Sequence, residues 1–485
     1  MEPIEKGSPR WWLDRLSVKL ADKQPRLKKL RDYAVGDHPL PEAADPKWKE
    51  RADAFARRSR TNYCGLAAAA VRERLHPVGI RSGEDGDEET DSFLWGIWQA
   101  SHLDADSERV HDASLTMSES YVICGQRADG TPIATAEDPR LVITEASPLN
   151  WREPLAGLKQ WLDPVANDWR AIVYLPDTIS YFKRDETQWQ PCSSDFETIV
   201  DEGENVEENR LGEVPIERFV NRMSHSGQNG LAEFEDAIDV QERINHLSLN
   251  LLQIAESQAF RQRYVKGLPT KDDDDNDIPP PFEAIVHSLW AVEDTDVVFG
   301  EFAQVDLSPL LNALKAAIEA FVTLTGLPPH YVAGDLVNAS ADAFAAAETR
   351  LTAKVRSKQR GFGESWERVL RLCAAWAGRE VPEDIELIWE DPERKTSAQL
   401  SDAALKAGQF GVPWRTRMAD YGKTPQEIKR MRKEREEDAA YDAKRSAAAA
   451  AELIGADDGA DSEQRADGLD AGGPGAASPA FAPDN

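Results

Sequence analysis

The sequence predicts an α+β fold that is mainly helical and divided into several units. Three observations lead to this prediction. At 485 residues the chain exceeds one small domain, since about 150 residues per domain suggests about two to four units. Short β-branched and aromatic segments lie in the first half of the chain, and apolar residues at helical spacing dominate the second half.

Composition excludes several classes of protein. The formal net charge of −30 argues against tight, nonspecific binding of nucleic acid, which depends on lysine and arginine neutralising phosphates. It does not argue against contact with DNA that must slide. No apolar run approaches the roughly 18 to 20 residues that cross a bilayer, and the amino terminus has no apolar h-region. We therefore expect a protein of the cytoplasm without a membrane partner.

The four cysteines are Cys64, Cys124, Cys192 and Cys373. They lie far apart and show no spacing typical of zinc or of a redox dithiol. We expect reduced, mostly buried thiols.

The first half of the chain predicts an antiparallel sheet with helices. Alanine-rich residues 52 to 75 favour a helix, and residues 93 to 98 and 113 to 120 favour two more. Strands are expected where β-branched and aromatic residues cluster, at 120 to 124, 141 to 144, 171 to 174 and 179 to 182.

Two long apolar helices are expected further on. Residues 233 to 260 would span roughly 40 Å. Their apolar residues are spaced alternately by three and four, as in helices that pack on helices: Ala237, Val240, Ile244, Leu247, Leu251 and Ile254. Residues 308 to 326 carry a second stripe: Leu311, Leu314, Ile318, Phe321 and Leu324. This pattern suits an antiparallel helix pair inside a monomer or a ring of copies. Additional apolar residues off the first stripe, Ile238, Leu249 and Leu252, favour the ring.

An acidic insert separates these two helices. It contains Asp272, Asp273, Asp274, Asp275 and Asp277 and is followed by three consecutive prolines, which together exclude helix. Residues 297 to 299 suggest one short strand. A calcium loop needs glycine at its sixth position, where Asp277 stands, so a solvated acidic loop on a small projecting subdomain is the favoured interpretation.

The last third of the chain is predicted to be helical. An alanine-rich helix runs from about 340 toward Gly361, bends at Phe362 and continues to Trp376, and residues 385 to 389 form a strand that returns to the first domain. Two capping boxes, Thr396 with Gln399 and Thr424 with Glu427, open further helices, the second of which runs to about Leu453. A disordered acidic tail is expected over residues 454 to 485.

Five cations lie on the long helix: Arg350, Lys354, Arg356, Lys358 and Arg360. They are either a solvated face balanced by carboxylates, or a surface that contacts DNA phosphate or an acidic neighbouring subunit.

The sequence contains no motif for catalysis or nucleotide binding. GxxxxGK[ST], HExxH, GxSxG and GxGxxG are all absent, and the histidines show no ligand spacing. We therefore predict no enzyme, no cofactor and no metal site.

Several blocks of sequence resemble the portal proteins of tailed bacteriophages with long noncontractile tails. The strongest block runs from Asp236 through Asn245 to Gly267. Weaker blocks follow the family's order along the chain: Leu27 to Leu30, Tyr33 to Pro41, Asn62-Tyr63, Val71 to Leu75, Val78 to Ile80, Trp95 to Ala100, Leu211 to Pro215 and Phe219 to Arg222. Together the matches extend from about residue 27 to residue 435.

The resemblance implies a ring of twelve subunits around a DNA channel at one capsid vertex. The corresponding regions would be a wing (1–228), two stem helices (229–262 and 307–325), a clip (263–306), a tunnel loop (326–339), a long kinked helix with a wing strand (340–395), crown helices (396–453) and the tail (454–485). The tunnel loop would place these residues in the channel: His330, Tyr331, Asp335, Leu336, Val337 and Asn338. The seam between copies would use Val240, Ile244, Leu247, Leu251, Ile254, Leu314, Ile318 and Phe321.

The function that follows is a structural conduit in the virion, built in the host cytoplasm. It would nucleate capsid assembly with the major capsid protein, dock the terminase large subunit and a head-tail adaptor, and pass double-stranded DNA. Two alternatives stay open. One is a metal-dependent phage nuclease that uses the aspartates from 272 to 277, and the other is a minor head or scaffold protein without a channel.

Overall fold

The computed structural model describes residues 5–40, 56–83, 87–185, 188–225, 229–259, 263–267, 298–301, 305–333, 341–393 and 395–460. The chain divides into one unit of residues Met1–Gln399 and a second of residues Leu400–Asn485. The first unit is α+β, and each of its registered strand pairs is antiparallel, as the sequence predicted.

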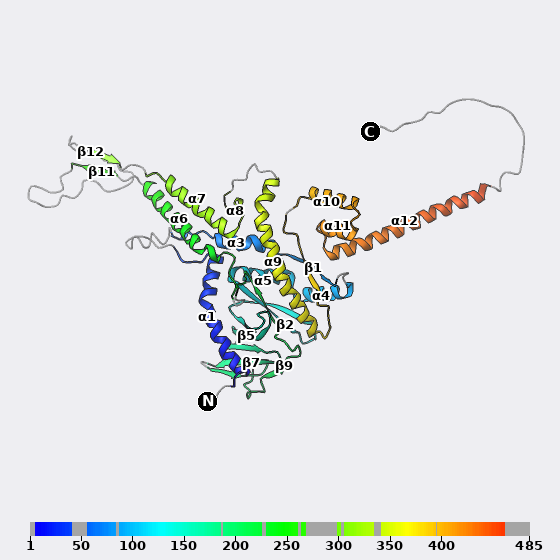
Figure 1. The fold of residues 1–485 in the computed structure, drawn as a ribbon, viewed down its shortest axis with the longest axis horizontal. Coiled ribbons are helices and arrows are strands. Elements are labelled where there is room, and N and C mark those ends of the chain that lie inside the picture. The colour runs from blue at the N-terminus through cyan, green and yellow to red at the C-terminus, as the bar shows by residue number, and fades with distance from the viewer. Residues whose placement is uncertain are drawn as a thin grey trace, which may run out of the picture. The chain divides into compact units, whose positions relative to one another are not determined.

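The amino-terminal helix α1 (Pro9–Val35) packs on a six-stranded sheet (Figure 1). Ser8 caps its start by accepting a hydrogen bond from the Trp11 N–H, and Gly36 ends it with a positive φ of 78°. Leu13, Leu16 and Leu20, spaced by three and four, are buried against the sheet. The strands are β4 (Val142–Ala146), β5 (Pro154–Leu162), β6 (Trp169–Tyr174), β7 (Thr178–Asp185) and β8 (Gln188–Pro191), with β9 (Val206–Glu208) also paired to β7.

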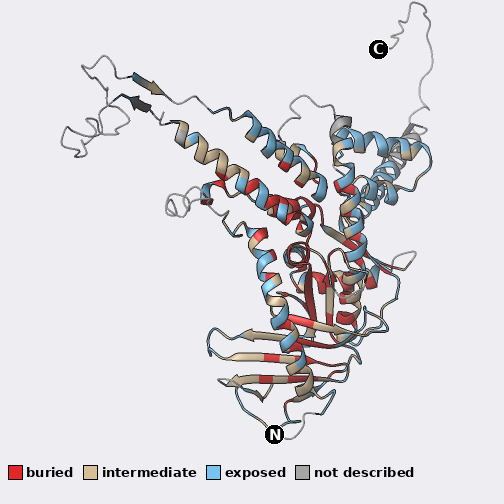
Figure 2. Ribbon diagram, turned by 60° about the vertical axis from the view of Figure 1, so that its left-hand side comes forward, coloured by how far each residue is buried: buried red, intermediate tan, exposed pale blue. Residues whose placement is uncertain are grey.

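A three-stranded sheet lies at the centre of the main core. Its strand order is β10 (Ile216–Val220), β2 (Glu119–Gln126) and β3 (Pro132–Glu137). The helices that contribute to this core include α3 (Tyr63–Arg72), α4 (Glu88–Ala100), α5 (Leu103–Met117) and α9 (Ala341–Trp376). Figure 2 shows buried residues concentrated where these elements meet. Trp366 of α9 is fully buried, with its ring 5.0 Å from that of Trp98 and 4.7 Å from that of Phe219.

The chain returns to its first half after α9. Strand β13 (Ile385–Trp389) pairs with β1 (Pro77–Ser82), so that Leu387 lies opposite Ile80. The predicted strand at 385 to 389 is therefore confirmed, and so is its return to the first domain. Helix α9 also continues through Phe362, as expected, because Val369, Leu370 and Trp366 extend its buried face.

The two apolar helices form an antiparallel pair. A short 3-10 turn, η2 (Glu235–Ala237), precedes α6 (Ile238–Ala259), and α7 (Ser308–Thr325) lies beside it in Figures 1 and 2. At the far end the Gln258 Nε2 donates to the Val305 carbonyl at 3.2 Å. Beyond that end, β11 (Arg263–Lys266) pairs with β12 (Val298–Glu301), which confirms the strand expected near 297 to 299.

The second unit consists of α10 (Ser397–Gln409, whose first turn belongs to the first unit), α11 (Trp414–Asp420) and α12 (Pro425–Ala460). Both predicted capping boxes form. The Gln399 N–H donates to Thr396 Oγ1 at 3.3 Å, and the Glu427 N–H donates to Thr424 Oγ1 at 3.2 Å. In each box the side chain three residues on accepts a hydrogen bond from the threonine N–H, at 2.9 and 3.0 Å.

Three expectations need correction. The helix predicted over 52 to 75 is divided, within the described residues, into a short helical piece at 56–59 and α3 (Tyr63–Arg72), because Asn62 interrupts it and accepts a hydrogen bond from the Gly65 N–H at 2.8 Å. Strands β1, β3, β5, β8, β9, β10 and β11 were not foreseen. Helix α12 continues to Ala460, past the expected start of the tail at 454. Residues 461 to 485 lie outside the described residues.

Two further expectations concern the cysteines and the membrane. All four cysteines are free and buried, as predicted. Burial raises the pKa of the Cys192 thiol to about 11, which keeps it protonated at neutral pH. Among the described residues, no helix is long and apolar enough to cross a membrane.

We expect Trp366→Ala to lower the free energy of unfolding by about 3 to 5 kcal/mol, because it leaves a cavity beneath α9. It also removes the indole N–H that donates to His111 Nε2 at 2.9 Å. Urea denaturation followed by circular dichroism measures the change. Val165→Ala is the control, since Val165 is 94% exposed and should change stability by less than about 0.5 kcal/mol. Equal effects of the two substitutions would contradict this description of the core.

Candidate functional site

The candidate site is the junction at which the α6 and α7 pair meets α9. The segment around Leu231 and Glu233, which leads into α6, is held by two backbone hydrogen bonds. The Leu231 N–H donates to the Asn221 carbonyl at 3.0 Å, and the Glu233 N–H donates to the Leu115 carbonyl at 2.8 Å. Gly230 approaches the backbone so closely that a Cβ there would lie 2.3 Å from the Ser118 carbonyl oxygen. Glycine is therefore required at this position.

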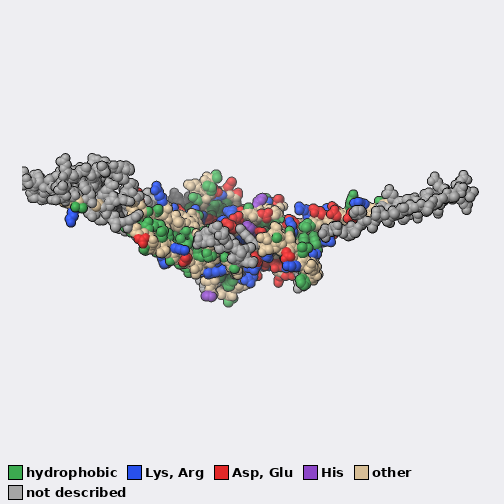
Figure 3. Space-filling model, turned by 90° about the horizontal axis from the view of Figure 1, so that it is seen from above, with side chains coloured by type: hydrophobic (Ala, Val, Ile, Leu, Met, Phe, Trp, Pro, Cys, Tyr) green, Lys and Arg blue, Asp and Glu red, His purple; other side chains and the backbone are tan. Residues whose placement is uncertain are grey.

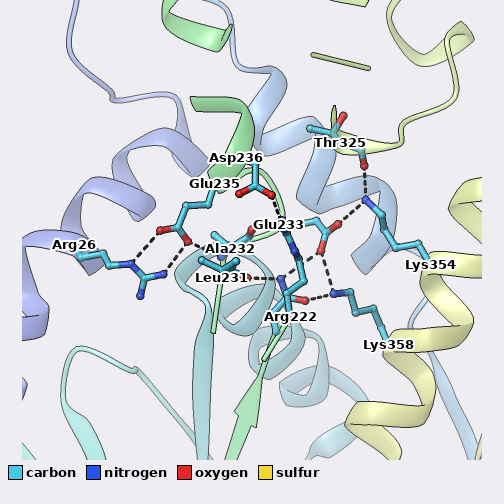
Figure 4. Close-up of polar contacts among 11 residues, drawn as sticks. Arg26, Arg222, Leu231, Ala232, Glu233, Glu235, Asp236, Thr325, Lys354 and Lys358 are labelled. Atoms are coloured by element: carbon cyan, nitrogen blue, oxygen red, sulfur yellow. Dashed lines mark hydrogen bonds and ion pairs between the residues drawn. The ribbon is translucent and has the colours of Figure 1, made fainter. Parts of the chain in front are cut away.

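Glu233 ties this segment to α9 (Figure 4). Its side chain is 2% exposed and forms ion pairs with Lys354 at 2.6 Å and with Lys358 at 3.3 Å. Asn221 Nδ2 also donates to the carboxylate at 3.3 Å, and Lys358 in turn donates to Asn221 Oδ1. One buried carboxylate thus holds two lysines that lie one helical turn apart on α9.

The electrostatics of this cluster favour the ionised carboxylate. Burial alone raises the pKa of Glu233, but the two lysines outweigh burial, and the resulting pKa lies below its usual range. Burial lowers the pKa of Lys358 against the opposing pull of Glu233. An ionised Glu233 is the consistent assignment, because two ammonium groups and an amide donor surround it.

The same cluster fixes the end of α7. Gly326 ends this helix with a φ of 70°, and its N–H donates to the Val322 carbonyl at 2.8 Å. Lys354 donates to the Thr325 carbonyl, and Arg350 Nη1 donates to the Thr323 carbonyl at 2.8 Å. Cations at the last carbonyls of a helix are favourable, since these groups carry the negative end of the helix dipole.

These contacts show where the five cations lie that the sequence assigned either to a solvated face or to a surface for DNA or a neighbouring subunit. Lys354 and Lys358 point into the junction, whereas Arg356 lies 3.4 Å from Asp391 and 3.3 Å from Glu393. Arg360 is exposed. The five cations therefore project in different directions, and four of them have partners within the chain. In the space-filling view, cations and carboxylates are interspersed (Figure 3).

A second salt bridge anchors α1 to the same segment. Arg26 binds Glu235 through two hydrogen bonds, of 3.0 and 2.8 Å, and donates to the Gly230 carbonyl at 2.9 Å. Arg222 pairs with Asp236. Sequence reasoning assigned no role to Glu233, Arg26 or Glu235, although Asn221 and Arg222 stood in a block that resembled the portal family.

A buried polar network holds the other side of α6. Gln241 Nε2 donates to the Thr61 carbonyl at 3.1 Å, and Gln241 Oε1 accepts from the Tyr63 N–H at 2.9 Å. Asn245 Oδ1 accepts from the Thr61 N–H at 2.9 Å, and its amide lies 2.7 Å from His38 Nε2. The base of α6 is therefore fixed through specific hydrogen bonds as well as apolar contacts.

The structure places part of the predicted tunnel loop. His330 and Tyr331 belong to the short helix α8 (His330–Ala333). Buried Arg74 donates to Tyr331 Oη at 3.0 Å and forms an ion pair with Glu348 at 3.0 Å, and His330 Nε2 lies 3.6 Å from Glu348. His330 and Tyr331 are thus attached to the body of the unit. Asp335, Leu336, Val337 and Asn338 lie outside the described residues.

The predicted seam residues divide into two groups. Val240, Ile244 and Phe321 are buried in the core of the single chain. A second copy would bury these three side chains little further, and their assignment to a seam stays a prediction. Leu247, Leu251, Ile254, Leu314 and Ile318 are half-buried, and Leu311 and Leu324 are 49% and 51% exposed.

The residues of the predicted acidic clip loop belong to a part of the chain that the structure does not describe. Asp272, Asp273, Asp274, Asp275 and Asp277 lie outside the described residues. Within the described ranges, no group of three or more His, Cys, Asp or Glu side chains could hold a metal ion.

We expect Glu233→Gln to destabilise the protein by about 3 to 5 kcal/mol, because it removes the buried carboxylate that is the counter-charge of two half-buried ammonium groups. Adding Lys354→Met and Lys358→Met should recover part of the loss. Glu213→Gln is the control, since it breaks an exposed pair with Arg368 worth less than about 1 kcal/mol. Urea denaturation of the four proteins makes the comparison.

The junction should also depend on pH. The folded pKa of Glu233 is lowered, so its contribution to stability is complete above the unfolded value of about 4.3 and is lost as the pH falls through the folded value. Unfolding curves from pH 7 to pH 3 should show a smaller loss for Glu233→Gln than for the unsubstituted protein. Parallel pH profiles would contradict the ionised assignment.

Comparison with known proteins identifies the family. The family model described as "Phage portal protein, SPP1 Gp6-like" matches residues 14–441. Proteins called "Portal protein" from Mycobacterium phage D29 and Mycobacterium phage L5 are each 29% identical over 399 residues, which is 78% of this chain and 79% of theirs. A solved chain from the neck of an empty gene transfer agent particle is 12% identical with a TM-score of 0.44, over 78% of this chain and 98% of that chain. The match across residues 14–441 shows that the chain belongs to the family of phage portal proteins.

Proposed function

We propose that the chain forms a homo-dodecameric ring at one vertex of a phage capsid and acts as the conduit for double-stranded DNA. Family membership over residues 14–441 is the observation that carries this proposal. In the ring, α6 and α7 are the stem, the segment between them is the clip, and residues 326–339 are the tunnel loop. The role is structural, and ATP hydrolysis for packaging belongs to a separate terminase.

The apolar surface of the α6 and α7 pair supports a ring. In the single chain five of the predicted seam residues of this pair are half-buried, and Leu311 and Leu324 are exposed. Burial of apolar area is the main favourable term in association, at about 25 cal/mol per Å². A rotational assembly gives each copy a neighbour on two sides, which covers such a surface.

The junction at Glu233 would transmit mechanical force between the helices of this ring. It joins the start of α6, the end of α7 and the middle of α9 through ion pairs and hydrogen bonds. The tunnel loop follows α7 and precedes α9 in the chain. DNA moving past the loop would therefore act on two helices that Arg350 and Lys354 join, and Lys354 is in turn held by the buried carboxylate of Glu233.

The partners follow from the same assignment. We propose that the clip region binds the terminase large subunit during packaging and a head-tail adaptor afterwards, and that the outer part of the first unit contacts the major capsid protein. The net charge of −30 is compatible with DNA that passes without tight binding.

Negative-stain microscopy of the purified protein tests the ring. We expect rings with a central hole, and Leu311→Asp with Leu324→Asp should abolish them by placing charges in the contact. Val18→Asp is the matched control, because Val18 is 61% exposed on α1 and should leave rings intact. A protein that stays monomeric at high concentration would contradict the proposal.

Deleting residues 336 to 338 tests the tunnel loop. We expect rings of normal appearance, because the flanking helices are fixed by Arg74, Arg350 and Lys354, but impaired packaging or DNA retention in an in vitro packaging assay. Loss of the rings in this variant would show that these residues serve assembly.

A further inference from the structure

Over residues 400 to 448, the second unit has no core of its own. Among residues 400 to 448, whose side chains the structure describes, Ile428 is the one buried hydrophobic residue. Leu405 and Phe410 are 70% and 87% exposed, and Figure 2 shows α10, α11 and α12 largely exposed. A unit of this size needs a packed core, or a partner in its place, to hold three helices together. Its apolar residues therefore require a covering surface from elsewhere.

Charge on α12 is separated along the helix axis into two bands. The basic band, residues 429 to 435, contains five cations and one carboxylate: Lys429, Arg430, Arg432, Lys433, Arg435 and Glu434. The acidic band, residues 436 to 442, contains four carboxylates and no cation: Glu436, Glu437, Asp438 and Asp442. Because successive residues lie 100° apart around the helix axis, the side chains of each band project on all sides of α12. A neighbouring copy on either side would therefore face residues of both bands.

Contacts within the helix do not account for this separation. The pairs Arg430–Glu434, Arg432–Glu436 and Lys433–Glu437 measure 3.5, 3.7 and 3.8 Å. Each of these side chains is more than half exposed, so solvent screens the pairs and they add little stability. Interspersed charges would provide such pairs equally well.

We propose that the second unit packs on the second unit of a neighbouring copy, with the basic band of one α12 against the acidic band of the next. This inference rests on the ring described above. The band centres are about seven residues apart, or roughly 10 Å along the axis, so two tilted copies of α12 that cross with this offset bring opposite charges together. DNA, which carries one sign of charge, would be repelled by the acidic band.

Rotational symmetry makes this contact repeat around the ring. Every copy of α12 points the same way relative to the axis, so each contact is heterologous and joins a basic band to an acidic one. Each copy uses both bands, one for each neighbour. Leu405 and Phe410, which belong to the same unit, are the apolar surface that such a contact can cover.

Charge reversal in the full-length protein tests the contact. One variant carries Lys429→Glu, Arg432→Glu and Lys433→Glu, and a second carries Glu436→Lys, Glu437→Lys and Asp438→Lys. At low salt, each alone should place like charges together and raise the concentration at which rings dissociate by roughly tenfold or more. Mass photometry on dilution measures that concentration.

Mixing the two variants is the decisive arm. In alternating rings every contact again joins opposite charges, so rings should recover, although positions 432 and 436 and positions 433 and 437 carry like charges within each helix. The control Asp201→Lys, Glu202→Lys and Glu204→Lys makes the same charge change as the second variant on an exposed loop and should dissociate like the unsubstituted protein. A mixture no more stable than its parts, or single variants that behave like the control, would overturn the contact.

A second measurement covers the case in which a reversed helix does not fold. Unsubstituted rings assembled from equal amounts of light and nitrogen-15-labelled chains are treated with a zero-length carbodiimide. The proposal expects cross-links between Lys429 or Lys433 and the acidic band that contain one light and one heavy peptide. Cross-links within single chains alone would reject it. If the unsubstituted protein forms no rings at all, the proposed function fails before this contact is in question.

Discussion

The buried carboxylate of Glu233 is the interaction on which the arrangement of the helices depends. It sits where the segment before α6 crosses α9, and it pairs with Lys354 and Lys358 on consecutive turns. Lys354 also donates to the Thr325 carbonyl at the end of α7. A buried charge destabilises the folded state when it has no partner, and with partners it fixes the positions of the groups that bind it. This cluster therefore specifies one arrangement of the three helices. An apolar contact of equal area would tolerate sliding by a turn.

Around this junction the helices show two kinds of surface. The base of α6 is fixed to the body by Ile244 in the core and by the network of Gln241, Asn245 and Thr61. Further along, α6 and α7 contact each other and keep apolar residues partly exposed. This combination suits a subunit of an assembly: the base of α6 is rigid, and the apolar surface left exposed on α6 and α7 can be buried by neighbouring copies. The second unit presents the same situation in a stronger form, since residues 400 to 448 bury one hydrophobic side chain and α12 separates its charges along the helix.

Sequence patterns predicted the elements with strong local signals. The period of the apolar residues located α6, α7 and α9, and two capping boxes located the starts of α10 and α12. Strands with alternating polar faces were missed. For example, β5 (PLAGLKQWL) has one face against α1 and the other against Val214 and Ile216, and its composition alone does not distinguish it from a loop. Its pairing depends on β4 and β6, so the strand is specified by neighbours rather than by its own residues.

By itself the sequence determined the helical segments, the acidic insert and the resemblance to portal proteins, because these rest on spacing, composition and order along the chain. Only the tertiary structure decided which way the cations of α9 point and which apolar residues of α6 and α7 are already buried. In the sequence, five cations within eleven residues suggest one basic surface. Successive residues of a helix project 100° apart, so Lys354 and Lys358 face Glu233 whereas Arg356 faces Asp391. Partners that lie more than a hundred residues away in the chain leave no local signal, and the function of a charged side chain depends on which partner it meets.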